Sequence, residues 1–256
     1  MTAAPRDPWL MRFAPRPAAA ALFVCFGPAG SGPSFFRRWA GLVPAEVELL
    51  VAQLPGREAR LAEAAVPEVG PLAGALAGAL RGLAPRPMVL FGHSMGALLA
   101  YEVAHRLAGG PAPLALAVAG REAPDVAMLG PHDFLDLPDA AFMAEVARRY
   151  GGVPDAVLAE PELIALVAPG VRADLRAVAG YREAARPALS CPLLVLHGLQ
   201  DPLTAQGRAE GWRTRSSGPV RLRAFAGGHF FVAEAAAEIV AEGLALLGIA
   251  GPPTVR

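Results

Sequence analysis

Residues 88–96 read Met-Val-Leu-Phe-Gly-His-Ser-Met-Gly, and this stretch gives the clearest indication of the fold in the sequence. The apolar run from Met88 to Phe91 predicts a buried strand, and residues 97–107 predict an apolar helix. The turn between them has the Gly-x-Ser-x-Gly pattern of a nucleophile elbow, in which a strained turn exposes a serine at the end of a strand. Glycines two residues before and after the serine leave room for the backbone to pass. The pattern therefore predicts Ser94 as a nucleophile, with an ordinary glycine-rich turn as the alternative.

Further apolar runs on both sides of this turn end in glycine- or proline-rich segments, and helical spacings lie between them. The other expected strands span residues 21–26, 47–53, 114–119, 193–197 and 220–225. The expected helices are one that begins after Ser34 as its N-cap and those over residues 69–83, 97–107, 205–212 and 233–247. Strands that alternate with helices predict an α/β fold with a mostly parallel central sheet flanked by helices.

One long segment departs from this alternation. Residues 121–186 contain no convincing strand, and their apolar spacing predicts helices over residues 140–150, 162–167 and 171–183. We therefore expect a single domain over residues 1–256 with a helical lid insertion at about 122–186. The insertion lies between the strand that ends near residue 119 and the strand that starts near residue 193.

A serine hydroxyl is a weak nucleophile and needs a base, which in turn needs an orienting carboxylate. On this fold the chain order is serine, acid, histidine. His229 lies on a glycine-rich loop after the last expected strand, and Asp201 follows the strand before it. The alternatives are a solvated loop histidine and a turn-forming aspartate. Asp125 and Asp174 lie in the insertion and fit the acid position less well.

Two backbone N–H groups are expected to stabilise an oxyanion beside Ser94. One belongs to Met95, which opens the helix after the elbow. The other comes from the glycine-rich loop at residues 27–32, where Pro28 has no N–H and Ala29 is the predicted donor, with a plain turn as the alternative. No cluster has the spacing of a metal site, and no dinucleotide fingerprint follows a strand, so we expect neither a metal nor a cofactor.

Composition excludes several classes of protein. The 256 residues carry 23 arginines, no lysine and 23 acidic residues, and this zero net charge argues against nucleic-acid binding. A hydrophobic fraction of 54% excludes disorder. Cys25 and Cys191 predict two buried free thiols rather than a disulfide. The apolar run at residues 18–26 is too short for a membrane span or signal peptide, so we expect a cytoplasmic protein that is not bound to a membrane.

The chain resembles the type II thioesterases, the discrete editing enzymes of polyketide and nonribosomal peptide synthesis. The resemblance runs nearly end to end and is specific because several strings carry it together. These strings are Trp9-Leu-Met-Arg-Phe13, Gln53-Leu-Pro-Gly-Arg-Glu58, Phe91-Gly-His-Ser-Met-Gly-Ala97, Gly120-Arg121, Ala123-Pro124, Leu137-Pro-Asp139, Gly151-Gly152, Arg172-Ala-Asp174, Asp201-Pro202 and Gly227-Gly-His-Phe-Phe231. The first loop departs from the family pattern, because Pro28 replaces the usual histidine.

The resemblance implies an α/β-hydrolase fold with a helical lid. It implies Ser94 as nucleophile, His229 as base and Asp201 as orienting acid, with an oxyanion hole formed by the N–H groups of Ala29 and Met95. The substrate would be an acyl thioester on the phosphopantetheine arm of an acyl or peptidyl carrier protein. The enzyme would act as a monomer and release aberrant or stalled acyl groups as free acids.

The lid is expected to line an apolar acyl chamber. The candidate chamber residues are Met128, Phe134, Leu135, Phe142 and Met143, and the alternative for each is a place in the packed core of the lid. Three other functions remain open from the sequence: a carboxylesterase or lipase with the same triad, an acyltransferase, and a non-catalytic module that binds carrier proteins.

Overall fold

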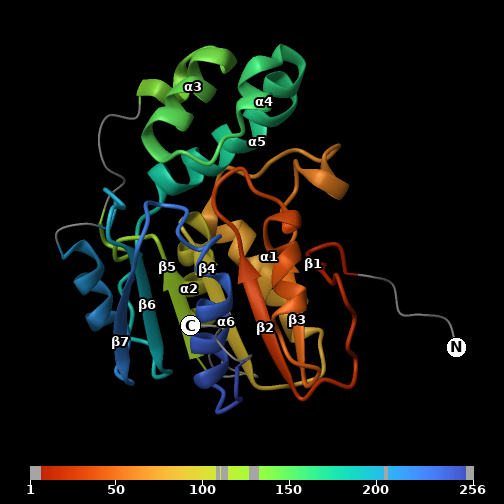
Figure 1. Cartoon of the computed structure of the whole chain (residues 1–256), viewed down its shortest axis with the longest axis vertical. Coiled ribbons are helices and arrows are strands. Elements are labelled where there is room, and N and C mark those ends of the chain that lie inside the picture. The colour runs from red at the N-terminus through yellow and green to blue at the C-terminus, as the bar shows by residue number, and fades with distance from the viewer. Residues whose placement is uncertain (1–6, 108–109, 111–114, 127–132, 205–206, 252–256) are drawn as a thin grey trace, which may run out of the picture.

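A computed structural model describes residues 7–107, 110, 115–126, 133–204 and 207–251. In this part of the chain one sheet has the strand order β1-β3-β2-β4-β5-β6-β7 (Figure 1). Its strands are β1 (Leu10–Met11), β2 (Ala21–Phe26), β3 (Val47–Ala52), β4 (Met88–His93), β5 (Ala115–Ala119), β6 (Leu193–Gly198) and β7 (Val220–Phe225). The edge strand β1 pairs antiparallel with β3, and every other pair is parallel. The expected fold class, a mostly parallel α/β sheet, is therefore confirmed.

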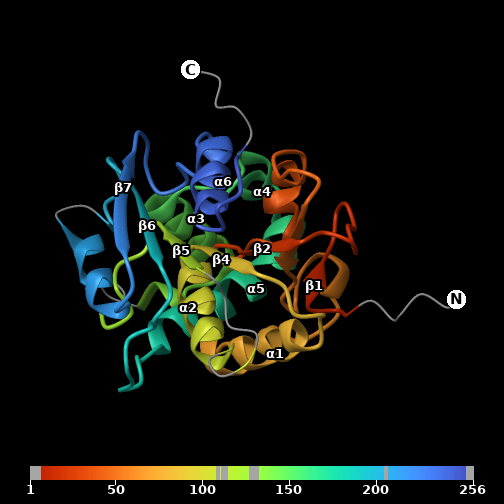
Figure 2. The same ribbon diagram turned by 90° about the horizontal axis from the view of Figure 1, so that it is seen from below.

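The central strands are apolar along their whole length because helices cover both faces of the sheet. In β2, Leu22 and Val24 point to one apolar cluster, whereas Phe23 and Cys25 point to the other. Helices α1 (Val69–Arg81) and α2 (Met95–Leu107) cover the first face, and α6 (Ala236–Ala245) covers the second. Figure 2 shows these two layers on opposite sides of the strands.

The helix expected after Ser34 forms, but with a different start and type. It is a 3-10 helix, η1 (Pro33–Gly41), which begins after Gly32. Ser34 is not its cap, because both its N–H and its hydroxyl donate to the Glu58 carboxylate, at 3.1 and 2.5 Å. Glu58 itself opens a short 3-10 turn, η2 (Glu58–Arg60). A contact 24 residues away in the sequence thus replaces the local cap.

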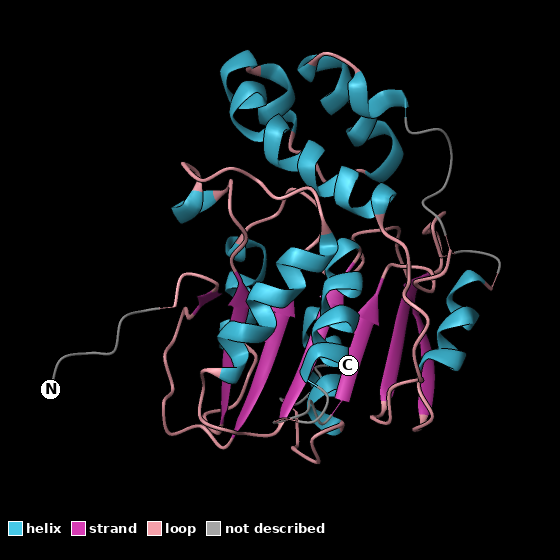
Figure 3. Cartoon of the chain, turned by 180° about the vertical axis from the view of Figure 1, so that it is seen from behind, coloured by secondary structure: helices cyan, strands magenta, loops and turns pink. Residues whose placement is uncertain are grey.

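The chain between β5 and β6 forms helices that lie above the carboxyl ends of the strands (Figure 3). They are η3 (Asp133–Asp136), α3 (Asp139–Tyr150), α4 (Asp155–Ala159) and α5 (Pro161–Gly180). We call this group the lid. The expectation of separate helices over residues 162–167 and 171–183 is wrong, because α5 continues through Pro169. Ala168, Gly170 and Val171 are buried there, so tertiary packing outweighs the loss of one helical hydrogen bond at the proline.

Two smaller differences concern short elements. Strand β1 was not predicted because two residues give no readable alternation. The helix expected over residues 205–212 is a 3-10 helix, η4 (Arg208–Arg215), and residues 205–206 lie outside the described part of the chain. In the described residues no helix is both long and apolar enough to cross a membrane. Both cysteines are free thiols, but only Cys25 is fully buried, whereas Cys191 is partly accessible.

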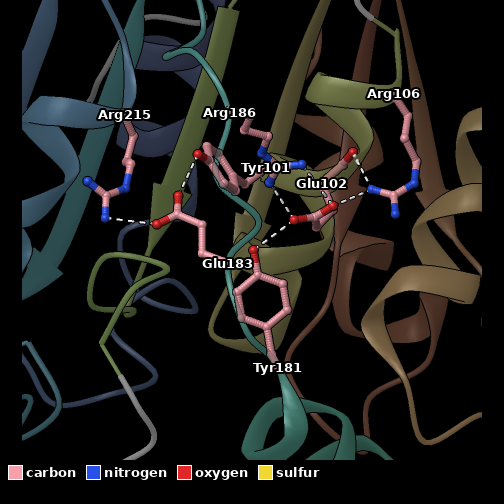
Figure 4. A network of polar contacts seen from close by, with 7 residues as sticks. All are labelled: Tyr101, Glu102, Arg106, Tyr181, Glu183, Arg186 and Arg215. Carbon is pink, nitrogen blue, oxygen red and sulfur yellow. Dashed lines mark hydrogen bonds and ion pairs between the residues drawn. The ribbon is translucent and has the colours of Figure 1, made fainter.

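Where the chain leaves the lid, a polar network fastens it to helix α2 (Figure 4). Glu102 of α2 accepts a hydrogen bond from the Tyr181 hydroxyl at 2.7 Å and ion-pairs with Arg186 and Arg106. Burial raises the pKa of the Glu102 carboxyl, but the hydrogen bonds from Arg186, Arg106 and Tyr181 outweigh it and lower the pKa to about 2. The carboxylate is therefore charged under all ordinary conditions.

A second part of the network joins the two ends of the lid. The Tyr101 hydroxyl of α2 donates to Glu183 at 2.7 Å, and Arg215 of η4 lies 2.9 Å from Glu183 and 2.7 Å from Asp125. Asp125 precedes the lid helices, and Glu183 follows them. Arg215 thus pairs with one residue before the lid helices and one residue after them.

We expect Glu102→Gln to lower the free energy of unfolding at pH 7 by about 1–3 kcal/mol, because the half-buried Arg186 loses its charged partner. The lowered pKa means that Glu102 stabilises the fold fully above its usual pKa of 4.5 and that this contribution is lost as the pH falls towards 2. Urea titrations from pH 7 to pH 2.5 should therefore show a smaller acid loss of stability in the variant than in the wild type. Equal slopes for the two proteins would contradict this assignment.

Candidate active site

Ser94 lies on the turn between β4 and α2 with a φ of 56°, the left-handed region that side chains rarely occupy. The flanking glycines are required for steric reasons. A Cβ at Gly92 would lie 2.1 Å from the carbonyl oxygen of Gly96, and one at Gly96 would lie 2.0 Å from that of Phe26. The Ser94 N–H donates to the carbonyl of Ala119 on β5 at 2.8 Å, which fastens the strained turn to the neighbouring strand. The structure thus has the expected nucleophile elbow.

The structure brings Ser94, His229 and Asp201 together at the carboxyl ends of β4, β7 and β6. His229 Nε2 lies 3.0 Å from Ser94 Oγ, and His229 Nδ1 lies 3.0 Å from Asp201 Oδ2. Asp201 is fully buried, and His229 is 7% exposed. Since parallel strands place their carboxyl ends at one edge, residues 135 positions apart in the sequence meet there. The contacts form a continuous chain from carboxylate to imidazole to hydroxyl.

The Asp201 carboxylate is held on both oxygens. Besides the contact of Oδ2 with His229, the backbone N–H of Leu203 donates to Oδ1 at 3.0 Å. Burial raises the pKa of Asp201, but the hydrogen bond and charge of His229, together with the Leu203 N–H, lower it below its usual value overall. An ionised carboxylate favours the Nδ1–H tautomer of His229, which leaves Nε2 free to accept a proton from Ser94.

His93, the variable residue before the serine, has a positioning contact that the sequence did not reveal. Its Nε2 lies 2.9 Å from the carbonyl oxygen of His229, which can only accept, so Nε2 carries the proton. Burial and the nearby His229 lower the pKa of His93 to about 3, and the ring is therefore neutral near pH 7. Through this contact His93 holds the loop that carries His229.

The first loop, after β2, forms a tight turn beside Ser94. The Ser31 N–H donates to the Pro28 carbonyl at 3.1 Å, and Gly30 has a φ of 78°, as the third position of a type II turn requires. Ala29 occupies the second position of this turn. Met95 is the first residue of α2, so its N–H has no acceptor within the helix. Ala29 and Met95 both line the cavity into which Ser94 opens.

The thioesterase domain family matches residues 22–245 of the chain, which include every residue of the site described above. The chain belongs to this family. A thioesterase of cadicidin biosynthesis from Streptomyces griseus is 39% identical over 88% of the chain, and the match spans 62% of that relative's length. Thioesterase PikA5 from Streptomyces venezuelae is 37% identical, with 88% of this chain and 80% of the relative covered.

Solved structures agree with this family membership. The type II thioesterase BorB from the borrelidin biosynthetic cluster superimposes with a TM-score of 0.85 and is 31% identical, covering 97% of this chain and 100% of its own. The expected thioesterase family and the α/β-hydrolase fold are therefore confirmed. The type II thioesterase YbtT, from the NRPS/PKS biosynthetic pathway of yersiniabactin, superimposes with a TM-score of 0.84 and is 28% identical, covering 94% of this chain and 98% of its own.

A cavity of about 250 Å³ lies between the lid and the sheet of this thioesterase, with Ser94 and His229 in its wall. Most of its wall is apolar, and the lid supplies half of the lining residues. The lid residues that line it are Met143, Val146, Tyr150, Gly151, Gly152, Val153, Pro154, Val157, Val167, Val171, Leu175 and Val178. Phe230, next to His229, packs closely on the lid, because a Cβ at Gly152 would lie 2.3 Å from its ring. The lid thus closes directly over the candidate triad.

Three of the five residues predicted to line the chamber do not line the cavity. Met143 lines the cavity, but Phe134, Leu135 and Phe142 are buried in the packed interior of the lid, so their assignment to the chamber is wrong. The rings of Phe134 and Phe142 stack on each other with centroids 6.1 Å apart, and Arg149 and Arg172 cover their faces. The two rings are therefore part of the packed core of the lid. Met128 lies outside the described residues.

Helix α5 supplies chamber residues that sequence reasoning missed. Val167, Val171, Leu175 and Val178 follow one another at intervals of four, four and three residues, which places them on one face of the helix. This periodicity is readable in the sequence. However, Pro169 and Gly170 lie within the periodic segment, and both residues favour a break in a helix.

The cavity wall also contains the charged residues Arg121 and Glu122, just after β5. Glu122 is 1% exposed and lies 3.7 Å from Arg121 and 3.6 Å from Arg208. Burial raises the pKa of its carboxyl. The chamber of this thioesterase therefore offers a long apolar wall with one charged corner.

Proposed function

We propose that the protein hydrolyses acyl thioesters carried on the phosphopantetheine arm of acyl or peptidyl carrier proteins, and so removes aberrant or stalled acyl groups from a synthase. The observation that carries this proposal is the opening of Ser94 into an apolar, lid-covered cavity in a chain of the thioesterase family. An apolar chamber suits an acyl chain, whereas the thiol end of the substrate must reach Ser94 through an opening.

In the first half of the proposed reaction, Ser94 Oγ attacks the thioester carbonyl carbon while His229 Nε2 takes the hydroxyl proton. The negative charge on the carbonyl oxygen is stabilised by the N–H groups of Ala29 and Met95. The C–S bond then breaks, and the departing sulfur takes the proton from His229. The acyl group is left on Ser94 as an oxygen ester.

In the second half, His229 removes a proton from water, which attacks the acyl-serine. The C–O bond to Ser94 breaks, the serine oxygen regains a proton from His229, and the carboxylic acid leaves. Asp201 keeps the imidazole in the required tautomer in both halves and stabilises its charged form. Each step uses protein groups and water alone, so the proposal requires no metal or cofactor.

The acyl-serine gives this proposal a direct test. Mixing the protein with an acyl-N-acetylcysteamine thioester, followed by rapid acid quench and peptide mass spectrometry, should add the acyl mass to the peptide that contains Ser94. The matched oxygen ester should acylate the same peptide more slowly. A faster reaction of the oxygen ester would favour the carboxylesterase or lipase alternative. Carrier binding with no acylation or turnover would favour the binding module.

An acyltransferase would share the acyl-serine but pass the group to a second acceptor. Adding alcohols, amines or thiols at millimolar concentration tests this alternative. If the protein is a hydrolase, free acid remains the main product. The added acceptor then gives transfer product only in proportion to its competition with water for the acyl-serine. Saturable formation of one transfer product at the expense of acid would contradict hydrolysis as the main reaction.

The Ala29 amide can be removed without removing the turn. We expect Ala29→Pro to lower kcat by about 10²- to 10³-fold, because proline lacks the N–H but fits the second position of a type II turn. The matched control is Ala29→Ser, which keeps the amide and is expected to retain kcat within about threefold. Circular dichroism melts establish that both variants fold. A Pro variant with wild-type kcat would exclude Ala29 from the oxyanion hole.

A further inference from the structure

Asp174 is a fully buried carboxylate on lid helix α5 that contacts the first loop rather than its own helix neighbours. Its Oδ2 accepts a hydrogen bond from the Gly30 N–H at 2.7 Å and ion-pairs with Arg57 Nη1. Its Oδ1 accepts from Arg57 Nη2 at 2.9 Å. The carboxylate therefore joins three segments that are far apart in the sequence: the lid, the loop after β2 and the loop after β3.

Arg57 is the ion-pair partner of the Asp174 carboxylate. Arg57 is 7% exposed, and its guanidinium pairs with both oxygens of Asp174, a geometry that fixes the direction as well as the distance of the contact. The same guanidinium donates to the Pro55 carbonyl at 3.3 Å and lies 3.4 Å from the Ser31 carbonyl oxygen. Arg57 thus contacts the Pro28–Ser31 turn at one end, while Asp174 contacts it at the centre.

Apolar packing reinforces this polar junction. A Cβ at Gly30 would lie 2.7 Å from Cγ2 of Val171, one helical turn before Asp174. A Cβ at Gly170 would lie 3.3 Å from the Gly56 carbonyl, so α5 also approaches the Arg57 loop closely. The turn that carries Ala29 is therefore pressed against α5 and hydrogen-bonded to it.

We propose that Asp174, oriented by Arg57, is a positioning residue that sets the place of the Ala29 amide in the oxyanion hole. Because Gly30 follows Ala29 directly, a shift of the Gly30 N–H away from Asp174 displaces the Ala29 peptide as well. The oxyanion hole then takes its geometry from the lid, and it is complete only while α5 rests on the turn. This inference depends on the proposed role of Ala29.

A purely structural ion pair between lid and core predicts different behaviour. Breaking such a pair lowers stability but leaves transition-state binding unchanged wherever the protein stays folded. A positioning residue instead lowers kcat, because displacement of about 1 Å in catalytic geometry costs as much as 10²-fold in rate. The two roles therefore separate in kinetics measured well below the melting temperature.

The test compares the neutral, similarly shaped variants Asp174→Asn and Arg57→Gln with their double variant, which leaves no unpaired buried charge. Asp139→Asn is the matched control, because it breaks a lid ion pair of 2.7 Å with Arg172 that does not touch the oxyanion turn. All are assayed with an acyl-N-acetylcysteamine thioester at a temperature where circular dichroism shows full folding. Binding of an acyl trifluoromethyl ketone, which forms an oxyanion on Ser94, is compared with binding of the product acid.

We expect Asp174→Asn to lower kcat by roughly 10- to 100-fold, with KM and product-acid affinity within about threefold of wild type. Affinity for the trifluoromethyl ketone should fall by the same factor as kcat. The double variant should be no slower than the slower single variant, because the two residues act as one unit. Asp139→Asn should retain both kcat and ketone affinity within about threefold.

Two results would overturn the inference. In the first, Asp174→Asn keeps wild-type kcat while its melting temperature falls. In the second, ketone and acid affinities fall by the same factor, which indicates a damaged cavity. Failure of the proposed function is a separate outcome, because it appears in the wild type as an absence of Ser94-dependent thioester hydrolysis.

Discussion

Replacement of Ser94 by alanine is expected to reduce kcat for thioester hydrolysis by about 10⁵-fold, to the residual rate that binding and the oxyanion hole alone support. The loss follows from the geometry, in which the Ser94 hydroxyl is the group that lies 3.0 Å from His229 Nε2. KM is expected to change little, because the cavity wall stays intact. Steady-state kinetics with an acyl-N-acetylcysteamine thioester measure the effect.

Ser34→Ala is the matched control for this variant. Ser34 is exposed, its hydroxyl bonds to Glu58, and it does not line the cavity. It is expected to retain wild-type kcat. If Ser94→Ala kept more than about a hundredth of the wild-type rate, Ser94 could not be the nucleophile, and the mechanism as a whole would fail.

Asp201→Asn is expected to lower kcat by about 10³- to 10⁴-fold with the fold preserved. An asparagine amide can donate to Nδ1, which leaves the proton on Nε2 and prevents His229 from accepting the Ser94 proton. Asp201 contacts both the imidazole and the Leu203 N–H, so the exchange keeps the side chain in place. The distinguishing result is a fall in kcat without a matching fall in melting temperature.

The control for Asp201 is Asp125→Asn, which neutralises an acid that the sequence offered as a weaker candidate. In the structure Asp125 pairs with Arg215 rather than with His229, and its side chain is 58% exposed. We expect kcat within about twofold of wild type, because exposed ion pairs contribute little. A large loss in Asp125→Asn and none in Asp201→Asn would reverse the assignment of the acid.

The parts of the site that depend on local backbone chemistry could be predicted from sequence. The elbow around Ser94 requires glycines at fixed offsets. Asp201 and His229 follow predicted strands whose carboxyl ends must share one edge of a parallel sheet. Pro28 also directed attention to Ala29, because proline has no N–H. In each case the signal lies within a few residues of the functional group.

The parts that depend on how the lid packs could not be predicted in the same way. Phe134 and Phe142 have the same apolar character as a chamber wall, and only their stacking under Arg149 and Arg172 shows that they stabilise the lid itself. Likewise, the break expected near Pro169 does not occur, because burial of α5 outweighs the local cost of proline.

His93 and Asp174 illustrate a third limit. His93 supports the loop of His229, and Asp174 reaches the Gly30 N–H across 144 positions of sequence. Neither contact has a local signature, although the strings that contain both residues resemble the thioesterase family. Their place beside the triad becomes visible only when the lid, the first loop and the strand ends are seen together.

The proposed action on acyl groups held by carrier proteins is tested by comparing three forms of one substrate. The same acyl group is presented as a thioester on a phosphopantetheinylated carrier protein, as an N-acetylcysteamine thioester and as the matched oxygen ester. We expect kcat/KM to be highest for the carrier-bound thioester and lowest for the oxygen ester. Faster hydrolysis of the oxygen ester, with no gain from the carrier protein, would contradict it.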